Sequence, residues 1–215
     1  MKKTALLLFP VLALAALGLW AYDNLTAPMG SFFADGAGLI MALARLTGIL
    51  GALGVMGQIL LMSRAPWLAP LTGGVPPVKW HHRAGMVIPL LLLAHPPLAA
   101  WHHSLLSGVP FAEQYLSILG WEDVPLAAAG LALIVAAALL SLDYFRRRLP
   151  YALWQRLHLG VYAGLALSVG HQLELGGDLS AELPYFSWAW YGLLAFTAGS
   201  ALWFRLLKPK FGAKA

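Results

Sequence analysis

The residues best suited to chemistry in this sequence are its seven histidines, all of which fall in two largely apolar segments. Five lie between positions 81 and 103 and two lie further along the chain: His81, His82, His95, His102, His103, His158 and His171. An ionisable side chain is costly to place in an apolar membrane segment, so each is a candidate functional residue. Neutral imidazole is also a common metal ligand. Two pairs of histidines are harder to explain as packing residues than a single one would be.

The spacing of these histidines is close to whole helical turns. His81 and His95 are 14 residues apart, a rise of about 21 Å that brings both side chains to one helix face. His158 and His171 are 13 residues apart, and an ideal helix would separate them by about 140°. The second pair therefore needs a local bend or a crossing geometry. His82 is the alternative to His81, and helical phase favours His81.

The elements that carry these histidines are predicted to lie in a membrane. Hydrophobic residues make up 60% of the chain and charged residues 11%, with a mean hydropathy of +0.73. A transmembrane helix needs about 20 mostly apolar residues. We expect an all-α, integral membrane six-helix bundle that forms a single domain over residues 1–215, with spans near 4–22, 36–62, 84–106, 124–143, 152–173 and 186–206. The first span is alternatively a signal peptide, because Lys2 and Lys3 precede it.

The charges sort by side if the six spans alternate. Every Lys and Arg except Arg45 falls at the N-terminus, within 63–83 or 143–156, or from position 205 onward. The other connecting segments carry Asp and Glu but no Lys or Arg. By the positive-inside rule both termini are cytoplasmic, in a cell inner membrane. The net charge of +5 is then a topology signal, and no nucleic-acid partner is expected.

Helix direction places the histidines at two levels. The third and fifth spans both run outward from the cytoplasm, so His81 lies level with His158, and His95 with His171. Each level then offers two imidazoles from different helices, which is the bis-histidine axial ligation of an electron-transfer haem. The haems are expected between the third and fifth helices, and two levels would form a two-step path for electrons through the bilayer. His102 and His103 are first expected to be polar residues at the outer interface.

Several other classes of site are excluded by composition. The chain has no cysteine, which excludes disulfides, thiolate metal sites, iron–sulfur clusters and covalently attached c-type haem. It also lacks a glycine-rich dinucleotide motif and a Walker-type loop. Any haem is therefore bound non-covalently, and electrons are expected from a separate protein or a membrane carrier.

Arg45 is the one basic residue expected outside the cytoplasmic segments, in the outer third of the second span. A charge at that depth should find a partner. We expect it to contact an outer haem propionate or a small anion formed nearby; the alternative is an arginine that reaches the outer headgroups. Trp154 and Trp80 are first expected at the membrane interface, with packing on the inner haem edge as the alternative.

Three groups of motifs resemble the ferric reductase-like transmembrane domain of ferric reductases, NADPH oxidases and the haem-binding subunit of the periplasmic methionine-sulfoxide reductase system. The first is Leu43-Ala-Arg-Leu-Thr-Gly48 with Gln58, Arg64 and Pro66-Trp67; the second is His81-His-Arg-Ala-Gly85 with His95-Pro96; the third is Trp154-Gln-Arg-Leu-His158 with His171. Together they cover nearly the whole chain.

The resemblance implies two stacked b-type haems in a six-helix bundle. His81 and His158 would ligate the inner haem iron, and His95 and His171 the outer one. Electrons would pass from a cytoplasmic flavoprotein or quinol to an outer acceptor that the sequence leaves open. The chain would then be an oxidoreductase, or alternatively a haem electron-relay subunit of a periplasmic oxidoreductase. A haem or metal transporter that uses the same histidines is a third, non-redox hypothesis.

Overall fold

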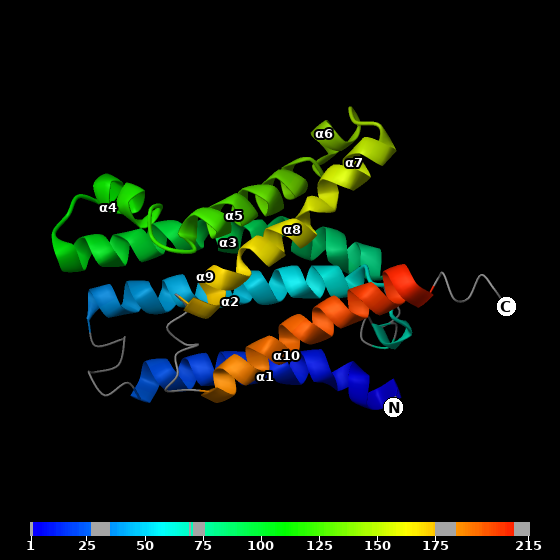
Figure 1. Cartoon of the computed structure of the whole chain (residues 1–215), viewed down its shortest axis with the longest axis horizontal. Helices are drawn as coiled ribbons and strands as arrows, with labels where there is room; N and C mark the ends of the chain where they lie inside the picture. The colour runs from blue at the N-terminus through cyan, green and yellow to red at the C-terminus, as the bar shows by residue number, and fades with distance from the viewer. Residues whose placement is uncertain (1, 27–34, 69, 71–75, 175–183, 209–215) are drawn as a thin grey trace.

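The computed structural model describes residues 2–26, 35–68, 70, 76–174 and 184–208, and every element in these ranges is a helix (Figure 1). The elements are α1 (Lys2–Thr26), α2 (Gly36–Leu61), η1 (Pro66–Leu68), α3 (Pro77–Ser107), α4 (Phe111–Ile118), α5 (Val124–Leu139), α6 (Asp143–Arg146), α7 (Tyr151–His158), α8 (Gly160–Leu167), α9 (Val169–Glu174), α10 (Pro184–Ala201) and η3 (Leu202–Leu207). The expected all-α class is confirmed for these residues.

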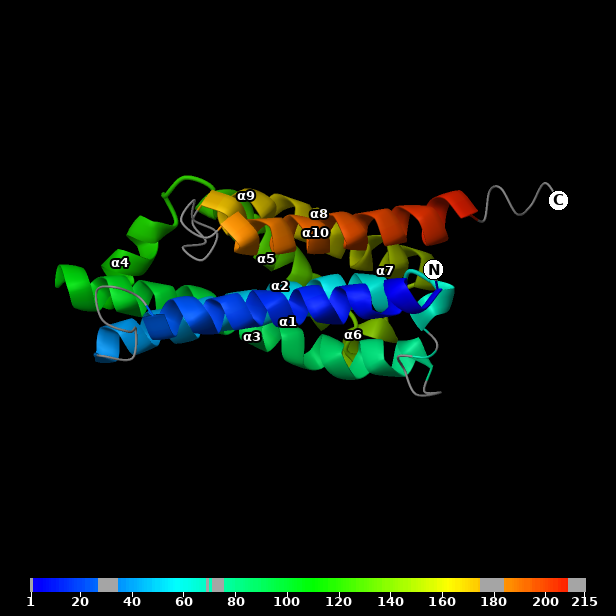
Figure 2. The same cartoon turned by 90° about the horizontal axis from the view of Figure 1, so that it is seen from below.

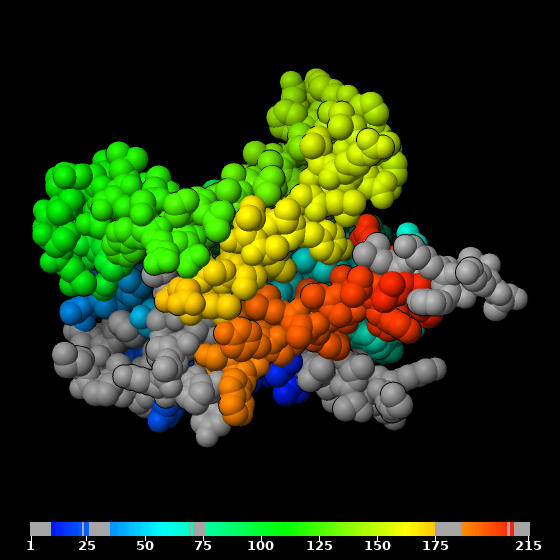
Figure 3. Space-filling view, in the orientation of Figure 1, coloured from blue at the N-terminus to red at the C-terminus, as the bar shows by residue number. Residues whose placement is uncertain are grey.

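The long helices run back and forth along one axis (Figures 1 and 2). In both views, the start of α1 and the end of η3 lie at the same end of the bundle. Figure 3 shows α4 and the α6–α7 turn projecting at opposite ends of the molecule. The basic α6–α7 turn is therefore at the end where α1 starts.

α2 is the central helix of the bundle. Its apolar residues on one side form a core with α1 and α10, in which Met56, Phe186 and Leu193 are almost completely buried. On another side it packs along α3, where Val55 and Ile59 meet Ile88. Burial of such apolar side chains is worth roughly 1.5–3 kcal/mol each in water; between helices in lipid, close packing replaces that term. α2 thus fixes the position of α3, which carries five of the histidines.

Two of the described helices, α2 and α3, are long and apolar enough to cross a membrane. Shorter apolar stretches occur at Pro10–Tyr22 and Val124–Leu139. α3 also exposes large apolar side chains, including Val87, Leu90 and Leu105, which suits a lipid-facing surface. The count of six crossings stays a prediction.

The α5–α8 crossing depends on two facing glycines. A Cβ added at Gly130 would lie 2.5 Å from the carbonyl oxygen of Gly164, and one added at Gly164 would lie 2.8 Å from that of Gly130. Both distances are shorter than van der Waals contact, and both neighbours are rigid backbone. Small residues let helix backbones approach closely in membranes. The crossing sets the distance between α8 and the rest of the bundle.

Gly130→Ala is expected to destabilise the protein by about 1–3 kcal/mol, because the added methyl group forces the two backbones apart. The measurement is the thermal unfolding midpoint in detergent. Gly160→Ala is the matched control, since a Cβ there would meet only Leu133 Cδ2 at 3.9 Å. Equal unfolding midpoints for the two variants would show that the close crossing does not contribute to stability.

Candidate functional site

The outer histidine pair joins α3 to α9. The rings of His95 and His171 have centroids 5.8 Å apart and an interplanar angle of 70°. His95 Nδ1 lies 2.8 Å from the backbone carbonyl oxygen of Ala44 on α2. Because a carbonyl oxygen only accepts hydrogen bonds, Nδ1 carries the proton and Nε2 is left as the free ligand atom. A carbonyl that fixes the tautomer in this way is typical of ligating histidines.

Gly48 forms the surface on which the His95 ring rests. A Cβ at this position would lie 3.0 Å from His95 Nδ1 and 3.2 Å from Cε1, closer than ordinary contact. The glycine therefore lets the imidazole lie against the backbone of α2 and reach the Ala44 carbonyl. Gly48 thus has a role in positioning His95. It is one of four glycines at three-residue steps along α2, Gly48, Gly51, Gly54 and Gly57, and this packing stripe does not by itself reveal that role.

A chain of polar groups holds α9, the six-residue helix that carries His171. Trp190 Nε1 on α10 donates to Gln172 Oε1 at 3.0 Å, and Gln172 Nε2 donates to Ser168 Oγ at 2.9 Å. Ser168 Oγ in turn donates to the Leu165 carbonyl at 2.8 Å. These bonds link α8, α9 and α10 directly beside the histidine. His171 Nδ1 itself is buried without a hydrogen-bond partner among the described residues.

A cavity of about 720 Å³ opens at the level of the outer pair, and both His95 and His171 line it. Its volume lies within the range of about 300–1,000 Å³ typical of small-molecule and cofactor sites. Most of the other lining side chains are apolar, many of them from α5. Arg45 is one of the few charged residues in the wall. The arginine predicted to face an outer ligand therefore does lie on the cavity.

The two remaining histidines of α3, His102 and His103, lie near its C-terminal end. His102 Nδ1 is 2.8 Å from the Ala37 carbonyl oxygen, which ties α3 to the start of α2. His103 lines the same cavity as the outer pair and contacts the Trp121 ring edge at a centroid distance of 5.0 Å. Both were expected at the membrane interface from the sequence, and the cavity contact of His103 was not predicted. The sequence positions of His102 and His103 do not indicate which of the two lines the cavity.

The inner histidine pair joins α3 to α7. The rings of His81 and His158 have centroids 5.8 Å apart and an interplanar angle of 76°. His82 is exposed, and its ring lies 6.3 Å from that of His81. Gln58 Nε2 on α2 donates to the His81 backbone carbonyl at 3.0 Å, which fixes this turn of α3. The structure therefore brings His81 against His158 and leaves His82 on the outside.

Ser141 orients the ring of His158. Its hydroxyl donates to the Ala137 carbonyl at 2.7 Å, and Trp154 Nε1 donates to its oxygen at 3.4 Å. His158 Nδ1 lies 3.1 Å from the same hydroxyl oxygen and 3.4 Å from the Ala137 carbonyl. Since the only hydroxyl proton is already used, Nδ1 is the donor to Ser141. His158 Nε2 is therefore free, as it is in His95.

Trp154 packs against the inner pair from the first turn of α7. Its ring stacks on that of His158, with centroids 5.0 Å apart and planes at 20°. The Arg146 guanidinium lies 4.5 Å from the centroid of the same indole ring, a cation–π contact. Of the two readings of Trp154, the structure favours packing against the inner pair, whereas Trp80 is exposed.

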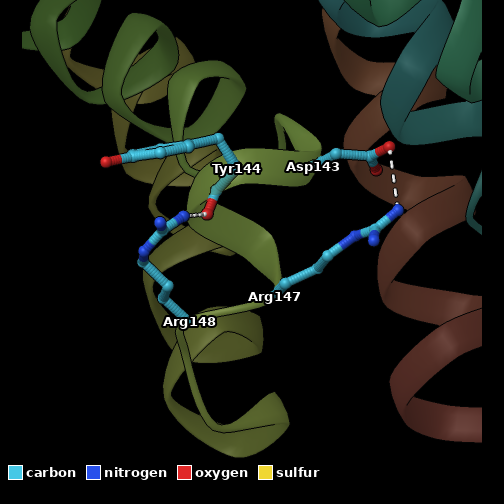
Figure 4. A network of polar contacts seen from close by, with 4 residues as sticks. All are labelled: Asp143, Tyr144, Arg147 and Arg148. Atoms are coloured by element: carbon cyan, nitrogen blue, oxygen red, sulfur yellow. Dashed lines mark hydrogen bonds and ion pairs between the residues drawn. The ribbon is translucent and has the colours of Figure 1, made fainter.

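The neighbouring arginines of the α6 turn are bonded locally (Figure 4). Arg147 Nη2 lies 3.5 Å from Asp143 Oδ2, and both side chains are highly exposed. Arg148 Nη1 donates to the Tyr144 carbonyl and its guanidinium lies over the Tyr144 ring. Exposed ion pairs of this kind contribute little to stability. Arg146 is thus the arginine of this turn that reaches the aromatic stack.

The 13-residue step between His158 and His171 is accommodated by two breaks in the helix. The segment is divided at Leu159 and Ser168 into α7, α8 and α9. At each break an i→i−3 bond forms, Tyr162 N to Leu159 O at 3.1 Å and Ser168 N to Leu165 O at 3.2 Å. A 3₁₀ turn advances about 120° per residue instead of about 100°. Both breaks therefore rotate His171 towards the face that carries His158.

Each level offers an imidazole pair whose spacing suits one metal ion. With metal–nitrogen bonds of about 2 Å, two imidazoles on opposite sides of an ion would have ring centroids about 6 Å apart, close to the observed 5.8 Å. A bare ion takes three or four protein ligands, and no cluster of three or more candidate ligands occurs among the described residues. Two axial imidazoles are what a haem iron requires. The donor set at both levels fits haem.

Comparison with known families gives one match. Residues 47–169 match the family model described as ferric reductase like transmembrane component. The matched range covers more than half of the chain and contains His81, His95 and His158, while His171 lies just beyond it. No curated protein and no solved structure shows a significant match.

Proposed function

The chain belongs to the ferric reductase-like transmembrane family, and from this premise we propose that it is a di-haem b-type cytochrome. Membership of the family makes it a membrane protein with a role in electron transfer. We propose further that it crosses the cell inner membrane several times with both termini cytoplasmic. Electrons would then move from the cytoplasmic side to an outer acceptor.

One observation carries this proposal: two pairs of imidazoles face each other between α3 and the α7–α9 segment. They are His81 with His158 and His95 with His171, each with ring centroids 5.8 Å apart. The two pairs are separated along α3 by about 21 Å, the rise from His81 to His95. Haem b bound at each pair would supply a one-electron carrier. The Nδ1 atoms of His95 and His158 are engaged in hydrogen bonds, so Nε2 is the atom that each ring would offer to iron.

The other residues orient the ligands and exclude water. Ala44 and Ser141 hold the tautomers of His95 and His158. Trp154 shields the inner pair, and the apolar wall of the outer cavity lowers the local dielectric, which tunes a redox potential. No side chain needs to act as a nucleophile or general acid. For the electron donor we propose a separate cytoplasmic flavoprotein or quinol, in keeping with a family whose members work with partner redox proteins.

Vesicles test this function directly. The protein is reconstituted with ferricyanide trapped inside, and a membrane-impermeant reductant is added outside. We expect the haem bands to be reduced and the trapped ferricyanide to be consumed. The rate should fall to that of protein-free vesicles in His171→Ala, while His82→Ala keeps the wild-type rate. Equal rates with and without protein would contradict transmembrane electron transfer.

Ser141→Ala is expected to weaken haem binding at the inner pair by about 10- to 100-fold, because His158 Nδ1 loses its hydroxyl partner and the ring is less well oriented. The measurement is haem dissociation followed by transfer to an excess of a soluble acceptor protein. Ser107→Ala is the control, since Ser107 bonds to the His103 carbonyl and Gln114 at the outer end of α3. Identical dissociation rates for the two variants would argue against a role of Ser141.

A further inference from the structure

Arg205 lies in a stretch of unusual backbone near the inner pair. α10 continues after Ala201 into η3, a π-helix over Leu202–Leu207 that contains this arginine. π-helical turns are rare and occur frequently at functional sites. In the sequence, Arg205 is one of the basic residues whose distribution indicates topology.

The contacts of Arg205 reach across to two other helices. Its Nη1 donates to the Met62 carbonyl and to the Tyr162 hydroxyl oxygen, both at 3.4 Å. Met62 is one helical turn beyond Gln58, which bonds to the His81 backbone, and Tyr162 is one turn beyond His158. Its guanidinium therefore lies close to the inner pair.

The charge of Arg205 is not neutralised by any side chain in the part of the chain that the structure describes. Among the described residues no acidic side chain forms an ion pair with it. Its two bonds go to neutral oxygens at long distances, although a guanidinium has five donors whose fork geometry matches a carboxylate. The residue is half-buried, and a cation in an apolar setting normally has an anionic partner.

We propose that Arg205 binds a carboxylate of the haem held between His81 and His158. This inference rests on the proposed function, because it requires a haem at the inner pair. The bonds of Arg205 point inward to α2 and α8, which favours a ligand inside the bundle over a lipid phosphate outside it. A carboxylate would replace the two long neutral contacts with short charge-assisted ones.

The test compares haem with haem dimethyl ester, whose carboxylates are neutral. Haem-depleted His171→Ala protein is used so that only the inner pair binds. We expect haem to bind about tenfold more tightly than its ester, a factor typical of a charge-assisted hydrogen bond. Adding Arg205→Gln should remove this preference, because it weakens the binding of haem and leaves the binding of the ester unchanged. A further readout is the midpoint potential of the inner haem, which should fall because loss of a cation stabilises the ferric state.

Two controls keep the test specific. Lys208→Gln removes a charge from the same helix end, where Lys208 lies over the Phe204 ring, and should leave the preference intact. Tyr162→Phe removes a neutral partner of Arg205 and should also leave it intact. If Arg205→Gln retains the preference, or if Tyr162→Phe abolishes it equally, the proposal is wrong.

Two other outcomes point elsewhere and also overturn it. The binding measurement is repeated in nanodiscs that contain anionic lipid. If the preference for haem is lost there, Arg205 is a binding site for lipid phosphate. Wild-type protein that binds no haem at all would instead refute the proposed function, and this inference with it.

Discussion

His171→Ala is expected to reduce the haem content from two per chain to about one. A low-spin bis-histidine haem needs both axial imidazoles, so the variant would remove one of the two iron–nitrogen bonds of the outer haem and weaken its binding enough for loss on purification. His95→Ala should have the same effect, since the two rings face each other at 5.8 Å. The measurement is a pyridine haemochrome assay on purified protein, normalised to chain concentration.

His102→Ala is the matched control for the outer pair. His102 is an α3 histidine whose Nδ1 is also bonded to a backbone carbonyl, that of Ala37. Its ring contacts that of His103 and belongs to neither the inner nor the outer pair. We expect this variant to keep two haems. If His95→Ala and His171→Ala also keep two, these residues are not the outer ligands.

His81→Ala should likewise remove one haem, whereas His82→Ala should retain both. The reason is geometric: the His81 ring lies 5.8 Å from that of His158, while His82 is exposed. The two variants differ by one position in the sequence and remove the same side chain, so each controls for the other. The same assay measures both, and reduced-minus-oxidised spectra show which haem band remains.

The opposite pattern of haem loss would identify His82, and not His81, as the inner ligand from α3. Loss of one haem in His82→Ala with two retained in His81→Ala would mean that α3 turns by about 100° around its axis when haem binds. His158→Ala should resemble His81→Ala in either case, because it supplies the other ring of the inner pair.

The sequence predicted the long central helices closely. The second span, expected near 36–62, is α2 over Gly36–Leu61. The third, expected near 84–106, is α3 over Pro77–Ser107 and begins earlier. Lys79 and Arg83 suggested a cytoplasmic segment there, but a helix can extend beyond the bilayer with its charges in water. Pro77 at its first position suits a helix start.

The pairing of levels was also predictable, because it depends only on helix direction and on spacing. The phase of the fifth span was not. An ideal helix separates His158 and His171 by about 140°, and the breaks at Leu159 and Ser168 are not marked by proline. Near the break at Ser168, Trp190 of α10 bonds to Gln172, which bonds in turn to Ser168; such a contact between helices is not visible in the sequence.

The supporting residues were the least predictable part of the site. Ser141 is 17 positions before His158, and Arg205 is 143 positions after Met62. Neither separation follows a helical period, and serine and arginine are ordinary residues at a membrane boundary. Gly48 looked like one of a stripe of packing glycines, and only the position of the His95 ring reveals its second role.

The most direct test of the account is the haem content of the purified wild-type protein. We predict two haems b per chain in the pyridine haemochrome assay, with a low-spin spectrum that a chemical reductant converts fully to the ferrous form. A colourless preparation that does not take up added haem would contradict the assignment of both histidine pairs and the electron-transfer function built on them.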